Sequence, residues 1–90
     1  MSEQKKKTLI NFKKASTHLE KIKKMVEQDE YCINIMQQNL AVIGLLKSAH
    51  QMLLENHLRS CFKTGMDSGS KKLKNDMIEE ILKITKLASK

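Results

Sequence analysis

The sequence predicts an all-α protein in which three helices form one small domain over residues 1–90. Proline is absent, glycine occurs three times, and aromatic residues make up 3% of the chain, a composition that favours long helices over sheets. Apolar residues recur at spacings of three and four through most of the chain, which is the period of one helix face. A chain of this length buries a limited core alone, so we expect it to form oligomers.

The first predicted helix covers residues 8–28, after a basic tail at about residues 1–7. Its outer face is rich in lysine, and its apolar side follows the helical period. The apolar positions are Leu9, Phe12, Ala15, Leu19, Ile22 and Val26. Residues 28–30 interrupt this pattern, and Asp29 is the expected N-cap of the next helix.

The second predicted helix runs from Tyr31 to about Lys63. One internal glycine, Gly44, costs about 1 kcal/mol relative to alanine and does not end a helix of this length. The loop TGMDSGS follows, and Ser70 is expected to cap a third helix over residues 71–89. No apolar run is long enough to cross a membrane, and the charged N-terminus does not resemble a secretory signal. We therefore expect a cytoplasmic protein with reduced thiols.

Both cysteines and one histidine share a stripe of the second helix. At 100° per residue, His57 and Cys61 point within about 20° of the direction of Cys32. A rise of 1.5 Å per residue nevertheless separates Cys32 from His57 by about 37 Å, too far for one ion. Two antiparallel copies with a two-fold axis near Leu45–Leu46 would bring Cys32 of one chain to His57 and Cys61 of the other. The seam would comprise Cys32, Met36, Asn39, Ile43, Leu46, His50, Leu54, His57 and Cys61.

The chemistry of these three side chains is that of soft ligands. Two thiolates and one imidazole favour Cu(I) or zinc over magnesium or calcium, and three ligands suit Cu(I) better than structural zinc. The same residues are compatible with a redox pair, or with two small hydrophobic side chains and an isolated imidazole. Tyr31 is a candidate to orient a ligand from its position beside Cys32. Asn39 and His50, nearly symmetric about the same axis, are candidates for a contact that fixes the register.

A net charge of +7 indicates an anionic partner, most often nucleic acid, although a basic face can also serve solubility alone. The lysines expected to contact DNA are Lys13, Lys14 and Lys21 of the first helix, with Lys47 as a lesser candidate. We do not expect an enzyme, because the chain has no glycine-rich phosphate loop and a helical bundle offers these thiols no evident substrate pocket.

Two stretches, MVEQDEYCINIMQQNLAVIGLL and LLENHLRSC, closely resemble the CsoR/RcnR/FrmR family of small bacterial repressors. The resemblance covers about residues 13–61 and continues more weakly through the third helix. It implies three-helix protomers, an antiparallel four-helix-bundle dimer and a dimer of dimers that releases operator DNA when its inducer binds. Cys32, His57 and Cys61 match the pattern of the Cu(I)-sensing branch. A third-helix glutamate that supports the histidine in the family corresponds to Glu79.

The first helix departs from the family motif R-I-x-G-Q-[IV]-x-G, because residues 14–21 read KASTHLEK. Lysine neutralises phosphate but lacks the bidentate fork with which arginine reads guanine. The resulting prediction is a homotetrameric Cu(I)-responsive repressor that binds operator DNA without metal and controls copper-resistance genes. Two alternatives stay open: a persulfide or thiol redox-sensing repressor on the same scaffold, and a cytosolic copper-binding protein without specific DNA recognition.

Overall fold

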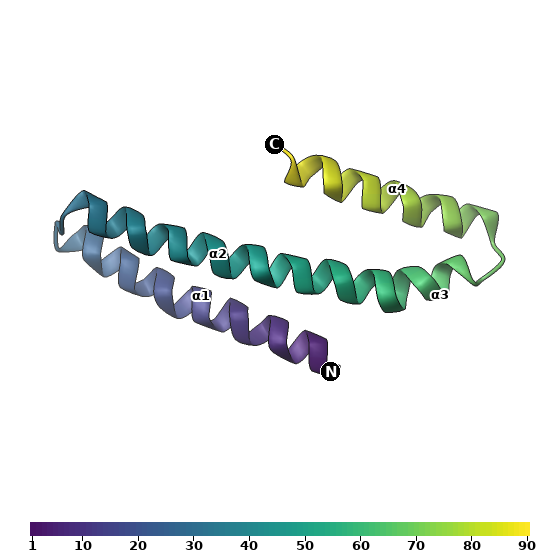
Figure 1. The fold of residues 1–90 in the computed structure, drawn as a ribbon, viewed down its shortest axis with the longest axis horizontal. Coiled ribbons are helices and arrows are strands. Elements are labelled where there is room, and N and C mark those ends of the chain that lie inside the picture. Colours follow the sequence, from purple (N-terminus) through teal and green to yellow (C-terminus); the bar gives the residue numbers. More distant parts are fainter. The chain divides into compact units, whose positions relative to one another are not determined.

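The computed structural model describes residues 1–90 and is helical, with no strand. The elements are α1 (Glu3–Glu27), α2 (Cys32–His57), the π-helical turn η1 (Leu58–Phe62), α3 (Lys63–Met66) and α4 (Lys71–Ala88), as Figure 1 shows. The backbone stays helical from α2 through η1 into α3, so the prediction of an all-α protomer with three helices is confirmed. No helix combines the length and apolar character needed to cross a membrane.

The chain divides into two compact units, residues 1–55 and residues 56–90. In the first unit, α1 and α2 lie side by side and run antiparallel (Figure 1). α1 begins at Glu3 rather than at residue 8, because the Ser2 hydroxyl accepts a hydrogen bond from the Lys5 amide at 3.2 Å and caps the helix. Residues 3–7, expected as part of a basic tail, are therefore helical.

The turn between α1 and α2 differs from the predicted one at Asp29. Asp29 is in the left-handed region, with φ of 56°, and it follows the C-cap of α1. Its amide donates to the Val26 carbonyl and the Glu30 amide donates to the Met25 carbonyl, which together form a Schellman motif. The prediction that Asp29 caps α2 was wrong. The Tyr31 carbonyl accepts the first hydrogen bonds of α2, so Tyr31 is the N-cap.

The contact between α1 and α2 combines small and larger apolar side chains. Ala15, Ile22 and Val42 form its buried centre, and Ala49 is 0% exposed. Small residues such as Ala15 and Ala49 let the two helices approach closely, and Ile35 and Leu45 pack against the buried centre. Two polar bridges join the helices: Asn11 donates to the Ser48 hydroxyl at 3.1 Å, and the imidazole of His18 is hydrogen-bonded to the Gln38 side chain.

In the second unit, α3 and α4 are joined by a short turn. The Ser70 hydroxyl accepts from the Leu73 amide at 3.2 Å, which confirms Ser70 as the cap of α4. The expected loop TGMDSGS is shorter than predicted, since its first three residues belong to α3. Gly65 is buried there because α4 approaches it closely, and a Cβ at this position would overlap the sulfur of Met77.

Candidate functional site

The hairpin of α1 and α2 leaves a continuous set of apolar side chains uncovered. Each of these residues comes one position after a residue that packs between the two helices; Ile43, for example, follows buried Val42. Exposed fractions range from 38% for Ile43 to 59% for Val26. We call this set, together with two polar residues on the same stripe of α2, the apolar face: Leu9, Phe12, Leu19 and Val26 of α1, with Met36, Ile43, Leu46, Leu53 and the polar Asn39 and His50 of α2.

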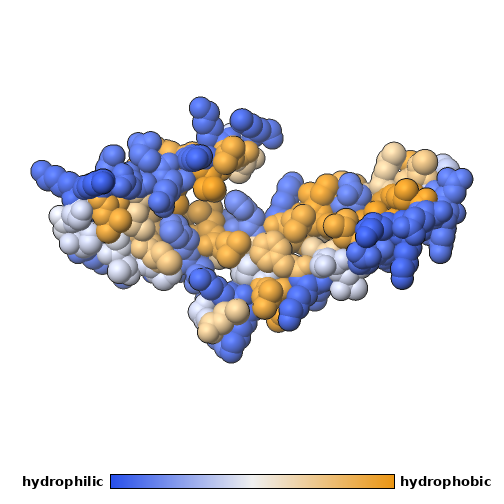
Figure 2. All heavy atoms as spheres, turned by 180° about the vertical axis from the view of Figure 1, so that it is seen from behind, coloured by the Kyte–Doolittle hydropathy of each residue, from blue (hydrophilic) through white to orange (hydrophobic).

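Both parts of the apolar face lie on the same side of the hairpin. One residue further along a helix is a rotation of 100° away from the packed direction. Because α1 and α2 run antiparallel, the two rotations have opposite senses when seen from one end, and they carry both stripes to the same side. Figure 2 shows hydrophobic side chains that reach the surface between hydrophilic ones. The apolar face includes the greater part of the seam predicted from the sequence.

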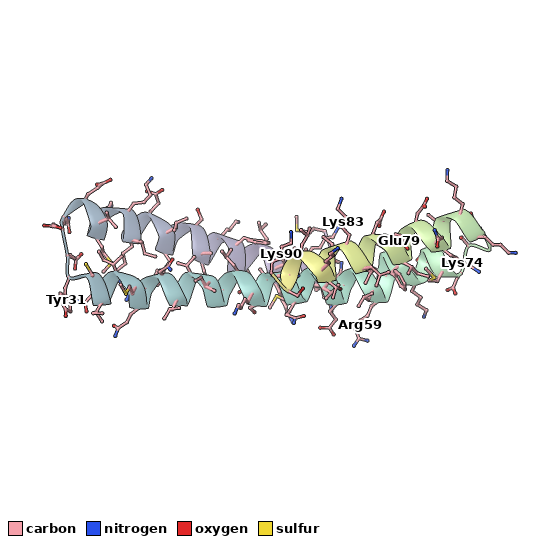
Figure 3. The ribbon with its side chains drawn as sticks, turned by 90° about the horizontal axis from the view of Figure 1, so that it is seen from above. Tyr31, Arg59, Lys74, Glu79, Lys83 and Lys90 are labelled. Atoms are coloured by element: carbon pink, nitrogen blue, oxygen red, sulfur yellow. The ribbon has the colours of Figure 1, made fainter.

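Cys32 is the first residue of α2 and its thiol is free and exposed. It lies on the same stripe of α2 as Met36 and Asn39. Tyr31, the candidate for orienting a ligand, is 70% exposed and lies at the tip of the hairpin, as Figure 3 shows. The start of α2 therefore presents a thiol at the end of the apolar face.

His57 and Cys61 lie in the second unit, where the helix changes type. His57 is the last residue of α2 and is half-buried, whereas Cys61 belongs to η1 and is exposed. In η1 the backbone hydrogen bonds span five residues instead of four, so the turn is wider. The Ser60 hydroxyl donates to the Asn56 carbonyl at 2.6 Å beside this turn. π-Turns are rare and occur frequently at functional sites.

A single chain does not assemble a metal centre. It contains no group of three or more His, Cys, Asp or Glu side chains placed to hold a metal ion. Glu79, the acid expected to support His57, is exposed on α4 (Figure 3). Cys32 belongs to the first unit, and His57 and Cys61 belong to the second.

The side of the hairpin opposite the apolar face is basic. A hollow lies there, between α1 and Leu45 of α2. Three lysines line it, which brings together the three α1 lysines predicted to contact DNA; Lys47 does not line it. The lining residues are Ile10, Lys13, Lys14, Thr17, His18, Lys21 and Leu45.

Two polar residues of this hollow, Thr17 and His18, were not among the predicted candidates. Lys14, Thr17 and Lys21 each come one position before a residue that packs against α2, so these three residues share one side of α1. That relation identifies them only once the packed positions of the hairpin are known. The two ion pairs of α1, Lys6–Glu3 and Lys23–Glu20, do not involve a lysine of the hollow.

A profile described as metal-sensitive transcriptional repressor matches residues 4–87. The chain belongs to this family. It is 33% identical over 85 residues to the copper-sensing transcriptional repressor CsoR of Mycobacterium ulcerans (strain Agy99), covering 94% of this chain and 73% of the relative. It is 30% identical over 89 residues to CsoR of Bacillus subtilis (strain 168), covering 99% of this chain and 85% of the relative. The family resemblance expected from the sequence is thus confirmed.

Two further comparisons add to this assignment. CsoR of Mycobacterium tuberculosis (strain ATCC 25618 / H37Rv) is 36% identical over 69 residues, 77% of this chain, and the chain spans 58% of that relative's length. The crystal structure of the copper-sensing repressor CsoR with Cu(I) from Geobacillus thermodenitrificans NG80-2 has a TM-score of 0.89 and 24% identity, and the match covers 100% of this chain and 91% of that one. Our chain therefore has the same fold as that crystal structure.

Proposed function

We propose that this chain is a Cu(I)-responsive transcriptional repressor whose metal sites form between two copies. One observation carries the proposal: α2 begins with Cys32 and ends with His57, four residues before Cys61, and the stripe between them is uncovered. Two antiparallel copies joined along this stripe would place Cys32 of one chain at the His57–Cys61 turn of the other. A two-fold axis would give two equivalent sites for each dimer.

The donor set fits Cu(I). Both thiols are free and exposed, so a metal ion can reach them without breaking a disulfide. Thiolate and imidazole are soft ligands, and three of them match the low coordination number of Cu(I) better than the four ligands of structural zinc. The names of the relatives specify copper sensing, which supports copper as the inducer. Tyr31 and Glu79 are the proposed supports for Cys32 and His57, respectively.

The basic side of the hairpin is the proposed DNA-binding surface. Lys13, Lys14 and Lys21 line one hollow and have no ion pair there, so they are available to neutralise phosphates. Lys47 would add a contact outside the hollow. In a dimer of dimers these lysines would repeat four times and form a broad positive surface, as expected for a repressor that acts on operator DNA in the cytoplasm.

The proposed metal ligands lie on α2 and η1, and the lysines of the hollow lie on α1, which packs against α2. The hairpin therefore provides a route for coupling. Closing both shared sites ties each end of α2 to the partner, and the hairpins then move as one body relative to the duplex. We expect DNA affinity to fall when the sites fill. Thermodynamic linkage requires DNA to weaken Cu(I) binding by the same factor, typically 5- to 150-fold for a coupling of about 1–3 kcal/mol.

A complementation experiment tests the shared site. Cys32→Ala and Cys61→Ala proteins should each lose tight Cu(I) binding in anaerobic titration. After subunit exchange between the two variants, each mixed dimer should regain one intact site, which restores about a quarter of the wild-type capacity if mixing is statistical. A site built within one chain would gain nothing from mixing. Unchanged Cu(I) affinity in the Cys32→Ala protein would contradict the proposal directly.

A thiol-sensing repressor is the second candidate, because both cysteines are exposed and free. His57→Ala distinguishes the two functions. In a copper sensor it should impair the release of DNA by Cu(I), whereas a persulfide sensor should keep its response to a persulfide donor. Operator affinity should be measured with and without one Cu(I) per chain at fixed salt. Equal affinities would rule out copper-released repression, and no specific binding in either state would indicate a copper-binding protein without DNA recognition.

A further inference from the structure

Two polar side chains interrupt the apolar face in the middle of α2. Asn39 and His50 are both exposed, and each has apolar neighbours on the same stripe. Neither side chain has a hydrogen bond within the chain, unlike Gln38 and Ser48 beside them, which bond to α1. Any partner that covers this face must therefore satisfy two polar groups, since an unsatisfied buried donor or acceptor costs about 1–3 kcal/mol.

A second copy of the chain satisfies both groups in one particular register. In an antiparallel pair, residues at equal distances on either side of the two-fold axis face each other. An axis between Gly44 and Leu45 pairs Ile43 with Leu46 and Met36 with Leu53, so apolar side chains meet apolar ones. The same axis pairs Asn39 with His50.

This axis also agrees with the proposed metal site. It places Cys32 opposite His57 and lies within about one residue of the axis near Leu45–Leu46 that brings Cys32 to the His57–Cys61 turn. Sliding one helix by a turn would bring His50 against Ile43 or Met36 of the other copy. Each dimer would then bury four unpaired polar groups instead of two hydrogen-bonded pairs, at a cost that favours the first register.

We propose that Asn39 of one chain hydrogen-bonds to His50 of a second copy, and that this pair fixes the register in which Cys32 faces His57. The inference rests on the cross-chain arrangement of the proposed function and adds the residues that select it. The Asn39 amide can donate to an imidazole nitrogen, and its carbonyl can accept from an imidazole N–H, so either neutral tautomer of His50 can pair. A single buried polar position fixes register in coiled coils in the same way.

Disulfide trapping in a background without native thiols measures the register alone. The reporter protein carries Cys32→Ser and Cys61→Ser together with Met36→Cys and Leu53→Cys. Within one chain the two new cysteines are about 25 Å apart along α2 and cannot join. In the proposed register each meets the other across the dimer, so mild oxidation should convert most of the protein into covalent dimers.

The matched variants exchange or remove the polar pair. Asn39→His with His50→Asn restores the pair by symmetry and should cross-link like the reporter. Asn39→Leu alone should lower the yield several-fold. Asn39→Leu with His50→Leu should keep the dimer in sedimentation yet lower the yield at least threefold, because the apolar seam no longer selects one register.

Three outcomes would overturn the proposal: no cross-linking of the reporter, full cross-linking of the double leucine variant, or an exchanged pair that behaves like Asn39→Leu. The background lacks the native thiols of Cys32 and Cys61, so these results do not depend on the proposed copper site. A failed Cu(I) titration of the native-cysteine protein would overturn the copper function and leave the register result standing.

Discussion

The apolar face and the basic side of the α1–α2 hairpin lie on opposite sides of the same two packed helices. Along α1, the residues of the two sides are two positions apart, one just after and one just before each packed residue. The residue after each packed position of α1 is often apolar, as Leu19 and Val26 are. The residue before it is often lysine, as Lys14 and Lys21 are. The packed positions between them include both apolar side chains, such as Ile22 and Met25, and the polar Thr8. The difference indicates two kinds of partner, an apolar surface on one side and a polyanion on the other.

The two sides should respond to salt in opposite ways. Lysine–phosphate contacts weaken as salt rises, because binding releases counterions from the nucleic acid. Apolar contacts do not weaken in this way, and salts that are excluded from protein surfaces strengthen them. Substitution of a lysine in the hollow should therefore change the salt dependence of DNA binding and leave the dimer almost unchanged.

The largest expected effect comes from a charge placed in the apolar face. Leu46→Lys would bury an unpaired ammonium next to the proposed two-fold axis, where an uncompensated charge costs about 3–5 kcal/mol. We expect the dimer dissociation constant to rise by two orders of magnitude or more in sedimentation equilibrium. Tight Cu(I) binding should be lost with it, because the shared sites need both chains.

Gln51→Lys is the matched control for this variant. It adds the same charge to α2 at an exposed position that comes before, rather than after, a residue facing α1. The dimer should persist. Equal dissociation of both variants would show that added charge, and not the apolar face, controls assembly, and a dimeric Leu46→Lys protein would place the interface elsewhere.

A smaller effect is expected from neutralising the hollow. Lys14→Gln and Lys21→Gln each remove one phosphate contact, so the slope of log affinity against log salt should fall by about 1 for each substitution. Affinity for all DNA sequences should fall together, since lysine contacts to phosphate carry little sequence information. Fluorescence anisotropy with a labelled duplex at several salt concentrations measures both quantities.

Lys47→Gln and Lys83→Gln serve as an intermediate case and a negative control for this test. Lys47 lies outside the hollow and should change the slope less than Lys14 or Lys21 does. Lys83 lies on α4 and should leave the slope unchanged. If Lys83→Gln reduced the slope as much as Lys21→Gln, DNA binding would reflect total charge and not the basic side of the hairpin. Sedimentation of all four variants should match the parent.

Local signals in the sequence predicted much of this architecture. Ser70 before an apolar run predicted the start of α4, because a capping hydroxyl acts within three residues of itself. Asp29 was misassigned, since aspartate suits both an N-cap and a left-handed residue after a helix. Only the hydrogen bonds of the Asp29 and Glu30 amides decide between the two, and these depend on where α1 ends.

Other features depend on contacts that the spacing of apolar residues along the sequence cannot reveal. The apolar side of α1 was predicted as one face, but Ala15 and Ile22 pack within the chain whereas Leu19 and Val26 face outward. A helical period cannot separate contacts to the same chain from contacts to another copy. The π-turn around Cys61 is likewise not encoded by spacing, because it arises from a one-residue shift in backbone hydrogen bonding. The grouping of Cys32, His57 and Cys61 stays a prediction.

The smallest predicted effect tests whether the apolar face and the basic side both depend on the hydrogen bond between Asn11 and Ser48. Asn11 lies between the two sides on α1 and donates to Ser48 of α2. Asn11→Ala should lower the free energy of unfolding by about 1 kcal/mol, since one hydrogen bond is lost at a partly exposed position. Dimer and DNA affinities should then weaken by similar small factors, because both surfaces need the hairpin intact. Asn34→Ala, at an exposed position of α2, should be neutral in thermal unfolding. A loss of DNA binding alone in Asn11→Ala would show that this residue acts on the basic side and does not support both.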